Sequence, residues 1–172
     1  GEIPPDVART AILLGMALIG AGLTCVWFEI GRPWRALNVY RHFATSWMTR
    51  EAIVALVLFP VAGLAMLTLV PFLVSLAGLL GLTFLYSQAR ILAANKGITT
   101  WRHPRSIPLM VTTGLTEGAG FLVCVASLSS TPVAPWLLVS LITLISVRVW
   151  GWNMYIAGVT NDGVPVEALK VL

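Results

Sequence analysis

Residues 51–94 read EAIVALVLFPVAGLAMLTLVPFLVSLAGLLGLTFLYSQARILAA, and Glu51 and Arg90 are the only charged side chains among them. A helix needs about 20 apolar residues to cross the hydrocarbon core of a bilayer, so this stretch is long enough for two spans. Pro71 is the natural break, because a proline disfavours helical geometry in the residue before it. We predict spans over 51–70 and 72–94 joined by a very tight turn. Pro60 lies inside the first of them, which membrane helices tolerate.

The rest of the chain supplies three more apolar segments, near residues 7–30, 108–128 and 136–157. The sequence is 58% hydrophobic and only 10% charged, and its mean hydropathy is +0.88. Soluble domains carry roughly 25% charged residues, so this composition belongs in lipid. We therefore predict an all-α fold: a polytopic transmembrane helix bundle with about five spans, forming a single transmembrane domain over residues 1–172.

Two connectors, residues 31–50 and 95–107, carry most of the basic side chains. With five spans, both connectors and the C-terminal tail fall on one side, and the other side has almost no Lys or Arg. The positive-inside rule then places the basic face in the cytoplasm. A single long helix over 51–94 would put the connectors on opposite sides, which the charge pattern argues against. The spacing of Trp34, Leu37 and Tyr40 predicts a short interfacial helix.

The first and fourth spans are rich in small residues, which let membrane helices approach closely. We expect close helix packing at these glycines, which are Gly15, Gly20, Gly22, Gly114, Gly118 and Gly120.

Charged groups inside a membrane are expensive, and they are functional candidates by default. Glu117 and Arg148 are each predicted to lie roughly 13 Å from the basic face, on consecutive antiparallel helices. We expect an ion pair or a shared polar network there. It would either fix the register of the two helices or form part of a proton path or polar cavity.

Further polar residues lie near the basic ends of the spans. Glu29 ends the first span, where it could exchange protons with a ligand entering from lipid or form an interfacial salt bridge to Arg32 or Arg50. Near the end of the third span, Tyr86, Gln88 and Arg90 could hydrogen-bond the same ligand, or could serve as interfacial anchors.

The sequence contains no pattern that predicts a metal or haem site. His42 and His103 both fall in predicted loops, whereas haem in a membrane bundle is normally held by histidines within the spans. Cys25 and Cys124 are too few for an iron–sulfur cluster, which usually needs four cysteines. We expect both thiols to be free and buried. If the protein handles electrons, the metal centres lie on a partner.

Two neighbouring motifs resemble a known family. Ile30-Gly31-Arg32-Pro33-Trp34-Arg35-Ala36 ends the first span, and Ser46-Trp47-Met48-Thr49-Arg50-Glu51 opens the second. They are similar to the L-G-x-P-x-R-A and S-W-x-x-R-E segments of the membrane-anchor subunit of dimethyl-sulfoxide reductase and its polysulfide-reductase-like relatives (the DmsC/NrfD type). Tyr86 to Arg90 and the Trp101-Arg102-His103-Pro104 loop also fit that pattern. The overall character is similar to the membrane subunit attributed to phenylacetyl-CoA:acceptor oxidoreductases.

The resemblance implies a quinone-reactive, non-catalytic subunit of an oxidoreductase complex of the kind used in anaerobic respiration. Such a subunit passes electrons between a membrane quinone (menaquinone or ubiquinone) and a docked four-cluster iron–sulfur subunit. That partner serves a catalytic subunit carrying molybdopterin with Mo or W, and the anchor itself holds no metal or haem. The location would be a bacterial or archaeal cytoplasmic membrane, with lipid around the helices and no nucleic-acid partner.

Relatives typically have about eight spans, so we expect this chain to be a piece of a longer protein, with helices missing before Gly1 and after Leu172. In dimethyl-sulfoxide reductase the docking face lies outside the cytoplasm. Either this complex faces the cytoplasm, as the charge asymmetry indicates, or the arginines serve docking and override the positive-inside rule.

By position, the resemblance implies a quinone site at Glu29, Arg32, Arg50, Glu51 and Tyr86. Some relatives have a histidine just before the L-G-x-P segment, whereas this chain has Glu29, whose carboxylate can also accept a proton. The basic connectors would dock the iron–sulfur subunit through Arg35, Arg41, Arg102 and Arg105. Two other functions remain open: a structural anchor without a quinone site, and a transporter or proton channel that uses Glu117 and Arg148.

Overall fold

The computed structural model describes residues 3–29, 46–98 and 100–161. Within these ranges the chain is all-helical, with five long helices and one short 3₁₀ helix: α1 (Pro5–Glu29), α2 (Trp47–Thr68), α3 (Pro71–Ala93), η2 (Thr100–Arg102), α4 (Ser106–Leu128) and α5 (Pro135–Asn161). All five long helices are long and apolar enough to cross a membrane. The prediction of a polytopic helical bundle with five spans is confirmed.

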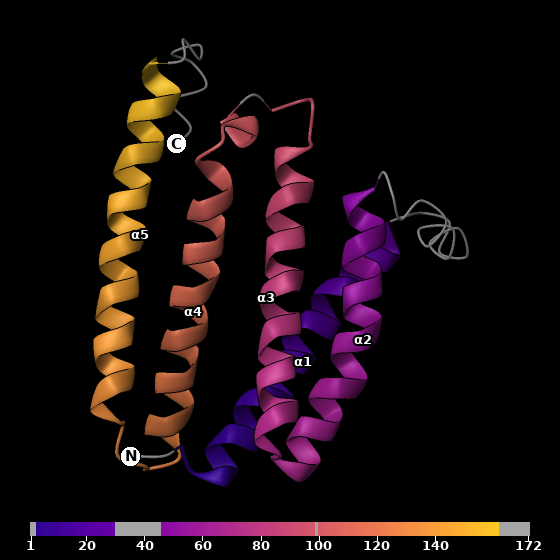
Figure 1. Cartoon of the computed structure of the whole chain (residues 1–172), viewed down its shortest axis with the longest axis vertical. Helices are drawn as coiled ribbons and strands as arrows, with labels where there is room; N and C mark the ends of the chain where they lie inside the picture. The colour runs from indigo at the N-terminus through magenta and orange to yellow at the C-terminus, as the bar shows by residue number, and fades with distance from the viewer. Residues whose placement is uncertain (1–2, 30–45, 99, 162–172) are drawn as a thin grey trace.

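Four of the helices form a layer that the fifth crosses. Helices α2, α3, α4 and α5 lie side by side in that order, and each runs opposite to its neighbour (Figure 1). Helix α1 runs diagonally across one face of this layer and contacts both α2 and α4. The arrangement leaves most large apolar side chains at the surface of the chain, as a lipid environment permits.

The turn between α2 and α3 is as tight as the sequence predicts. Helix α2 ends at Thr68, and Leu69 adopts the left-handed conformation with φ 53° while its N–H donates to the Ala65 carbonyl at 2.8 Å. Pro71 is the first residue of α3, where its missing N–H costs no hydrogen bond. Two linking residues force the helices to be antiparallel neighbours, so the start of α2 lies beside the end of α3.

Helix α2 begins at Trp47, four residues before the expected start at Glu51. The reason is a side-chain cap: Ser46 is extended (φ −111°, ψ 123°), and its hydroxyl accepts a hydrogen bond from the Thr49 N–H at 3.4 Å. A serine at this position satisfies one of the amides that an α-helix leaves unpaired at its start. Arg50 and Glu51 are therefore held on a regular helix and not on a loop.

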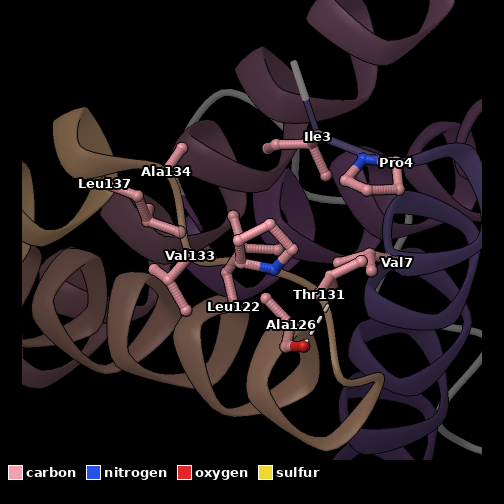
Figure 2. A pocket seen from close by; sticks show the side chains of 10 residues that line it. Ile3, Pro4, Val7, Leu122, Ala126, Thr131, Val133, Ala134 and Leu137 are labelled. Atoms are coloured by element: carbon pink, nitrogen blue, oxygen red, sulfur yellow. Dashed lines mark hydrogen bonds between the residues drawn. The ribbon is translucent and has the colours of Figure 1, made fainter. Parts of the chain in front are cut away.

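The start of α1 packs on the end of α4. Val7, Val125 and Ala126 form a buried apolar cluster, against which Ile3 and Val133 pack. Figure 2 shows the small apolar pocket at this place, between the first turn of α1 and the segment that leads from α4 into α5. The Thr131 hydroxyl donates to the Ala126 carbonyl at 2.7 Å and closes the turn. These contacts anchor one end of α1 to the layer.

The glycines differ in what they contribute to packing. A Cβ atom at Gly114 would lie 2.7 and 2.8 Å from the two methyl groups of Leu85, so α4 and α3 approach closely only because this residue has no side chain. A Cβ atom at Gly20 would lie 3.7 Å from the Phe59 ring, an ordinary van der Waals contact. A Cβ atom at Gly15, Gly22 or Gly118 would meet nothing within 4 Å. A Cβ atom at Gly120 would lie 3.9 Å from Leu141, also an ordinary contact. Close packing is thus confirmed at Gly114 but not at the other five.

Cys25 and Cys124 are free but exposed, so the prediction that they are buried was wrong. Both lie on apolar helices, but on faces that no other described helix covers. In a membrane protein an apolar run does not reveal which of its residues face lipid and which face the bundle.

The two ends of the bundle correspond to the two predicted sides. The end of α1, the start of α2, the α3–α4 connector and the end of α5 lie at one end, which we call the connector end (Figure 1). The start of α1 and the turns after Thr68 and Leu128 lie at the other. The predicted interfacial helix, together with Arg32, Arg35 and Arg41, lies outside the described residues. Which end faces the cytoplasm stays a prediction.

Candidate functional site at the connector end

The tight hairpin gathers six polar and aromatic side chains at the connector end. Three come from the first turns of α2 and three from the last turns of α3. We call this group the α2–α3 polar cluster; its members are Trp47, Arg50, Glu51, Tyr86, Gln88 and Arg90.

The centre of the cluster is a hydrogen bond between the two helices. The Gln88 side-chain amide Nε2 donates to Oε1 of the Glu51 carboxylate. Both side chains are half-buried, although Glu51 lies on a helix that is otherwise apolar. A carboxylate at this depth is expensive unless it has a partner, and Gln88 supplies one. The amide also fixes the orientation of the carboxylate.

Trp47 brings the basic and aromatic members of the cluster together. Its ring meets that of Tyr86 edge to face, with centroids 5.8 Å apart and planes at 82°. The guanidinium carbon of Arg50 lies 4.3 Å from the Trp47 ring centroid, and that of Arg90 lies 4.6 Å from it. Such cation–π contacts hold two positive charges on one aromatic platform. The Trp47 side chain is only half-buried, and the neighbouring Tyr86 side chain is 41% exposed.

Three of the predicted quinone-site residues, Arg50, Glu51 and Tyr86, are therefore brought together. Gln88 and Arg90, which the sequence suggested as partners of Tyr86, lie in the same cluster. Sequence reasoning missed the role of Trp47. The spacing of Tyr86 and Arg90, one helical turn apart on the same face, was the available sign that a common partner lies opposite them.

The other predicted quinone-site residues are not part of this cluster. Glu29 is exposed at the end of α1 and makes no hydrogen bond or ion pair to another described residue. Arg32 lies outside the described residues. The role predicted for Glu29 stays a prediction.

Glu117 and Arg148 are not brought together. Helices α4 and α5 are antiparallel neighbours as expected, but both side chains are exposed, and no hydrogen bond or ion pair joins them in the part of the chain that the structure describes. Depth along two helices is set by residue number, but the direction in which a side chain points is set by its rotation about the axis. Their functional role stays a prediction.

A second contact region joins the α3–α4 connector to the end of α5. The Tyr155 hydroxyl donates to the Thr100 carbonyl at 3.0 Å, and the rings of Tyr155 and His103 meet edge to face at 5.7 Å. Nη1 of Arg105 donates to the Met154 carbonyl at 2.6 Å. A Cβ atom at Gly158 would lie 2.7 Å from both the Arg105 guanidinium and the His103 ring, so a glycine is needed here.

This region bears on the predicted docking residues. Arg105 is exposed but uses one N–H to bind α5, whereas Arg102 is exposed on η2 beside Trp101, which is 37% exposed. Sequence reasoning missed the contribution of Tyr155 and Gly158, because nothing in the connector specifies which helix it packs against. These contacts join the described part of the connector to the end of α5.

The described residues contain no group of three or more His, Cys, Asp or Glu side chains that could hold a metal ion. His103 lies in the connector between η2 and α4, as predicted. The α2–α3 polar cluster presents one carboxylate, one amide and two guanidiniums beside two aromatic rings, so it can both hydrogen-bond and border a flat polar ligand.

Comparison with known proteins agrees with the resemblance seen in the two motifs. Searches of curated proteins and of solved structures found no match to this chain. The family model of the DMSO reductase anchor subunit (DmsC) matches residues 6–159, which include all five helices nearly end to end. The chain therefore belongs to the DmsC family of membrane anchor subunits of DMSO reductase.

Proposed function

We propose that this anchor subunit is quinone-reactive, and that the α2–α3 polar cluster binds the quinone head group. The observation that carries the proposal is the Glu51–Gln88 pair: a half-buried carboxylate inside a membrane helix, oriented by an amide from the neighbouring helix. Intramembrane ionisable residues mark proton and ligand paths more often than packing positions.

The chemistry follows from the groups present. A quinone interconverts with its quinol by gaining or losing two electrons and two protons. Gln88 holds Glu51 through one oxygen, so the second carboxylate oxygen is the acceptor for one hydroxyl proton of the quinol. The other proton leaves to water at the connector end, and the two electrons pass to the docked iron–sulfur subunit. Trp47 and Tyr86 would border the flat ring, and their aromatic surfaces exclude water from one side of it. The arginines on Trp47 place positive charge where negative charge develops on a reduced ring.

The position of the cluster suits electron transfer to a docked partner. It lies at the connector end of the bundle, which also carries η2 with the exposed Arg102 (Figure 1). We propose that this face docks a four-cluster iron–sulfur subunit, which passes electrons to or from a subunit with molybdopterin. Arg102, Arg105, Arg35 and Arg41 would steer an acidic partner surface. The charge asymmetry of the sequence favours a cytoplasmic location for this face in a bacterial or archaeal inner membrane.

The test is the Glu51→Gln substitution in the assembled complex. Glutamine keeps the size and one hydrogen-bond acceptor but cannot take up a proton at neutral pH. We expect the turnover number of quinol-linked activity to fall about 100-fold, which is the lower end of the range for loss of a positioned proton acceptor. Activity measured with an artificial dye that reacts directly with the catalytic subunits should not change, because the dye bypasses the membrane.

Two other carboxylates in the spans provide the matched controls. Glu117→Gln changes an exposed membrane carboxylate on α4, a helix that contributes no residue to the cluster. This variant should leave quinol-linked activity intact. Glu29→Gln tests the other proton acceptor predicted from the sequence. Full quinol-linked activity in the Glu51→Gln complex would refute the proposal, and a loss confined to Glu29→Gln would move the site to the end of α1.

A further inference from the structure

An apolar hollow in the described bundle lies between α1 and the α2–α3 hairpin. Its volume is about 320 Å³, and its lining is almost entirely apolar. That size falls in the range of about 300–1,000 Å³ that is usual for ligand pockets. Part of the space exists because three of its lining residues are Gly15, Gly78 and Gly81, at which a Cβ atom would meet nothing within 4 Å.

On α2, two residues that line the hollow share a helix face with Glu51. Leu58 and Ala62 line it, and they are 7 and 11 residues after Glu51. At 3.6 residues per turn these steps bring a side chain back to within about 20° of the same helix face. The rise of about 1.5 Å per residue places the two side chains about 10 and 16 Å from Glu51 toward the membrane centre.

The same steps occur on α3, which runs in the opposite direction. Gly81 and Ala77 line the hollow, and they are 7 and 11 residues before Gln88. They too lie on the face of the helix that carries the cluster residue, at about 10 and 16 Å from it. The polar pair and the hollow are therefore aligned along one side of the hairpin, with the polar groups at the connector end.

We infer that the hollow binds the isoprenoid tail of the quinone whose head group lies at Glu51 and Gln88; the inference rests on the proposed function. The pairing of a polar end with an apolar channel on the same two helix faces matches an amphipathic ligand with one chain. At the polar end, the cluster offers such a ligand a carboxylate and an amide to hydrogen-bond and the Trp47 and Tyr86 rings to border a flat head group.

The test fills the hollow without touching the polar pair. Gly78→Leu and Gly81→Leu each place a side chain where the structure has open space. In the assembled complex they should raise KM about tenfold for menaquinol with its full isoprenoid tail, equivalent to about 1.4 kcal/mol of lost binding. KM for menadiol, which has the same ring and no tail, should stay unchanged, as should kcat for both.

Gly118→Leu on α4 is the matched control, because this exposed glycine also has open space around it but does not line the hollow. Gly78→Ala, which adds one methyl group, guards against a leucine variant that does not assemble. An equal change of KM for both quinols, or none for either in assembled leucine variants, would overturn the inference while leaving the head-group site intact. A wild-type complex that neither oxidises menaquinol or ubiquinol nor reduces the corresponding quinones would overturn the proposed function and the inference with it.

Discussion

The contact between Gly114 and Leu85 gives a stability prediction that the structure makes quantitative. In Gly114→Ala the new Cβ atom would lie 2.7 and 2.8 Å from two Leu85 methyl carbons, against about 3.4 Å for the shortest ordinary contact. The overlap is thus about 0.7 Å (3.4 − 2.7) on a branched side chain that belongs to the neighbouring helix. Overpacking of this kind costs about 1–3 kcal/mol. Alanine in place of glycine returns about 0.8–1.0 kcal/mol of helix propensity.

The net free energy of unfolding of Gly114→Ala should therefore fall by about 0–2 kcal/mol. The same helix contains its own control one turn later: Gly118→Ala gains the propensity but meets nothing within 4 Å. The difference between the two variants removes the propensity contribution, and it should be about 1–3 kcal/mol. The assay is unfolding of the full chain in mixed detergent micelles by increasing SDS, followed by circular dichroism.

The partner residue supplies a second check. Replacing Leu85 by Ala removes both methyl groups that the Gly114→Ala side chain would strike. The double variant should then be more stable than the sum of the two single changes predicts, with a coupling of about 1–3 kcal/mol. Equal stabilities of Gly114→Ala and Gly118→Ala, or additive effects with Leu85→Ala, would refute the packing described here.

Two further predictions concern helix ends, and the same unfolding assay checks both. Gly158→Ala should be about 1–3 kcal/mol less stable than helix propensity alone predicts, because its Cβ would strike the His103 ring and the Arg105 guanidinium; a gain of the full propensity, about 0.8–1.0 kcal/mol, would mean that the connector does not rest on α5. Ser46→Ala should cost about 0.5–2 kcal/mol by removing the α2 cap, and Ser46→Asp should restore most of it. If alanine and aspartate behaved alike, the hydroxyl would not be the cap.

The sequence by itself determined the class of fold and the location of the helices. Apolar runs of about 20 residues have the length that a membrane span needs. Because the hydrocarbon core cannot hydrogen-bond free backbone groups, such runs must be helical. Pro71 fixed the hairpin, because proline disfavours helix before it and is well suited to a first helical position. The two motifs around Pro33 and Ser46 indicated the family, which the match to residues 6–159 established.

The sequence also went part of the way to the candidate site. Once α2 and α3 were known to be antiparallel neighbours, Glu51 and Tyr86 had to lie near the same end of the bundle. What it could not supply was rotation about each helix axis. That rotation allows the Gln88 amide to donate to Glu51 and brings two guanidiniums onto the Trp47 ring. It also leaves Glu117 and Arg148 exposed, with no hydrogen bond or ion pair between these two described residues.

Only the tertiary structure decided which small residues matter and where space remains. Gly114 and Gly118 are alike in sequence, yet one contacts Leu85 and the other contacts nothing within 4 Å, because contact depends on the helix that lies opposite. The diagonal course of α1 leaves a hollow beside α2 and α3 for the same reason. Length and hydropathy are properties of one segment, whereas packing is a property of pairs of segments, and in lipid no apolar stripe shows which faces meet.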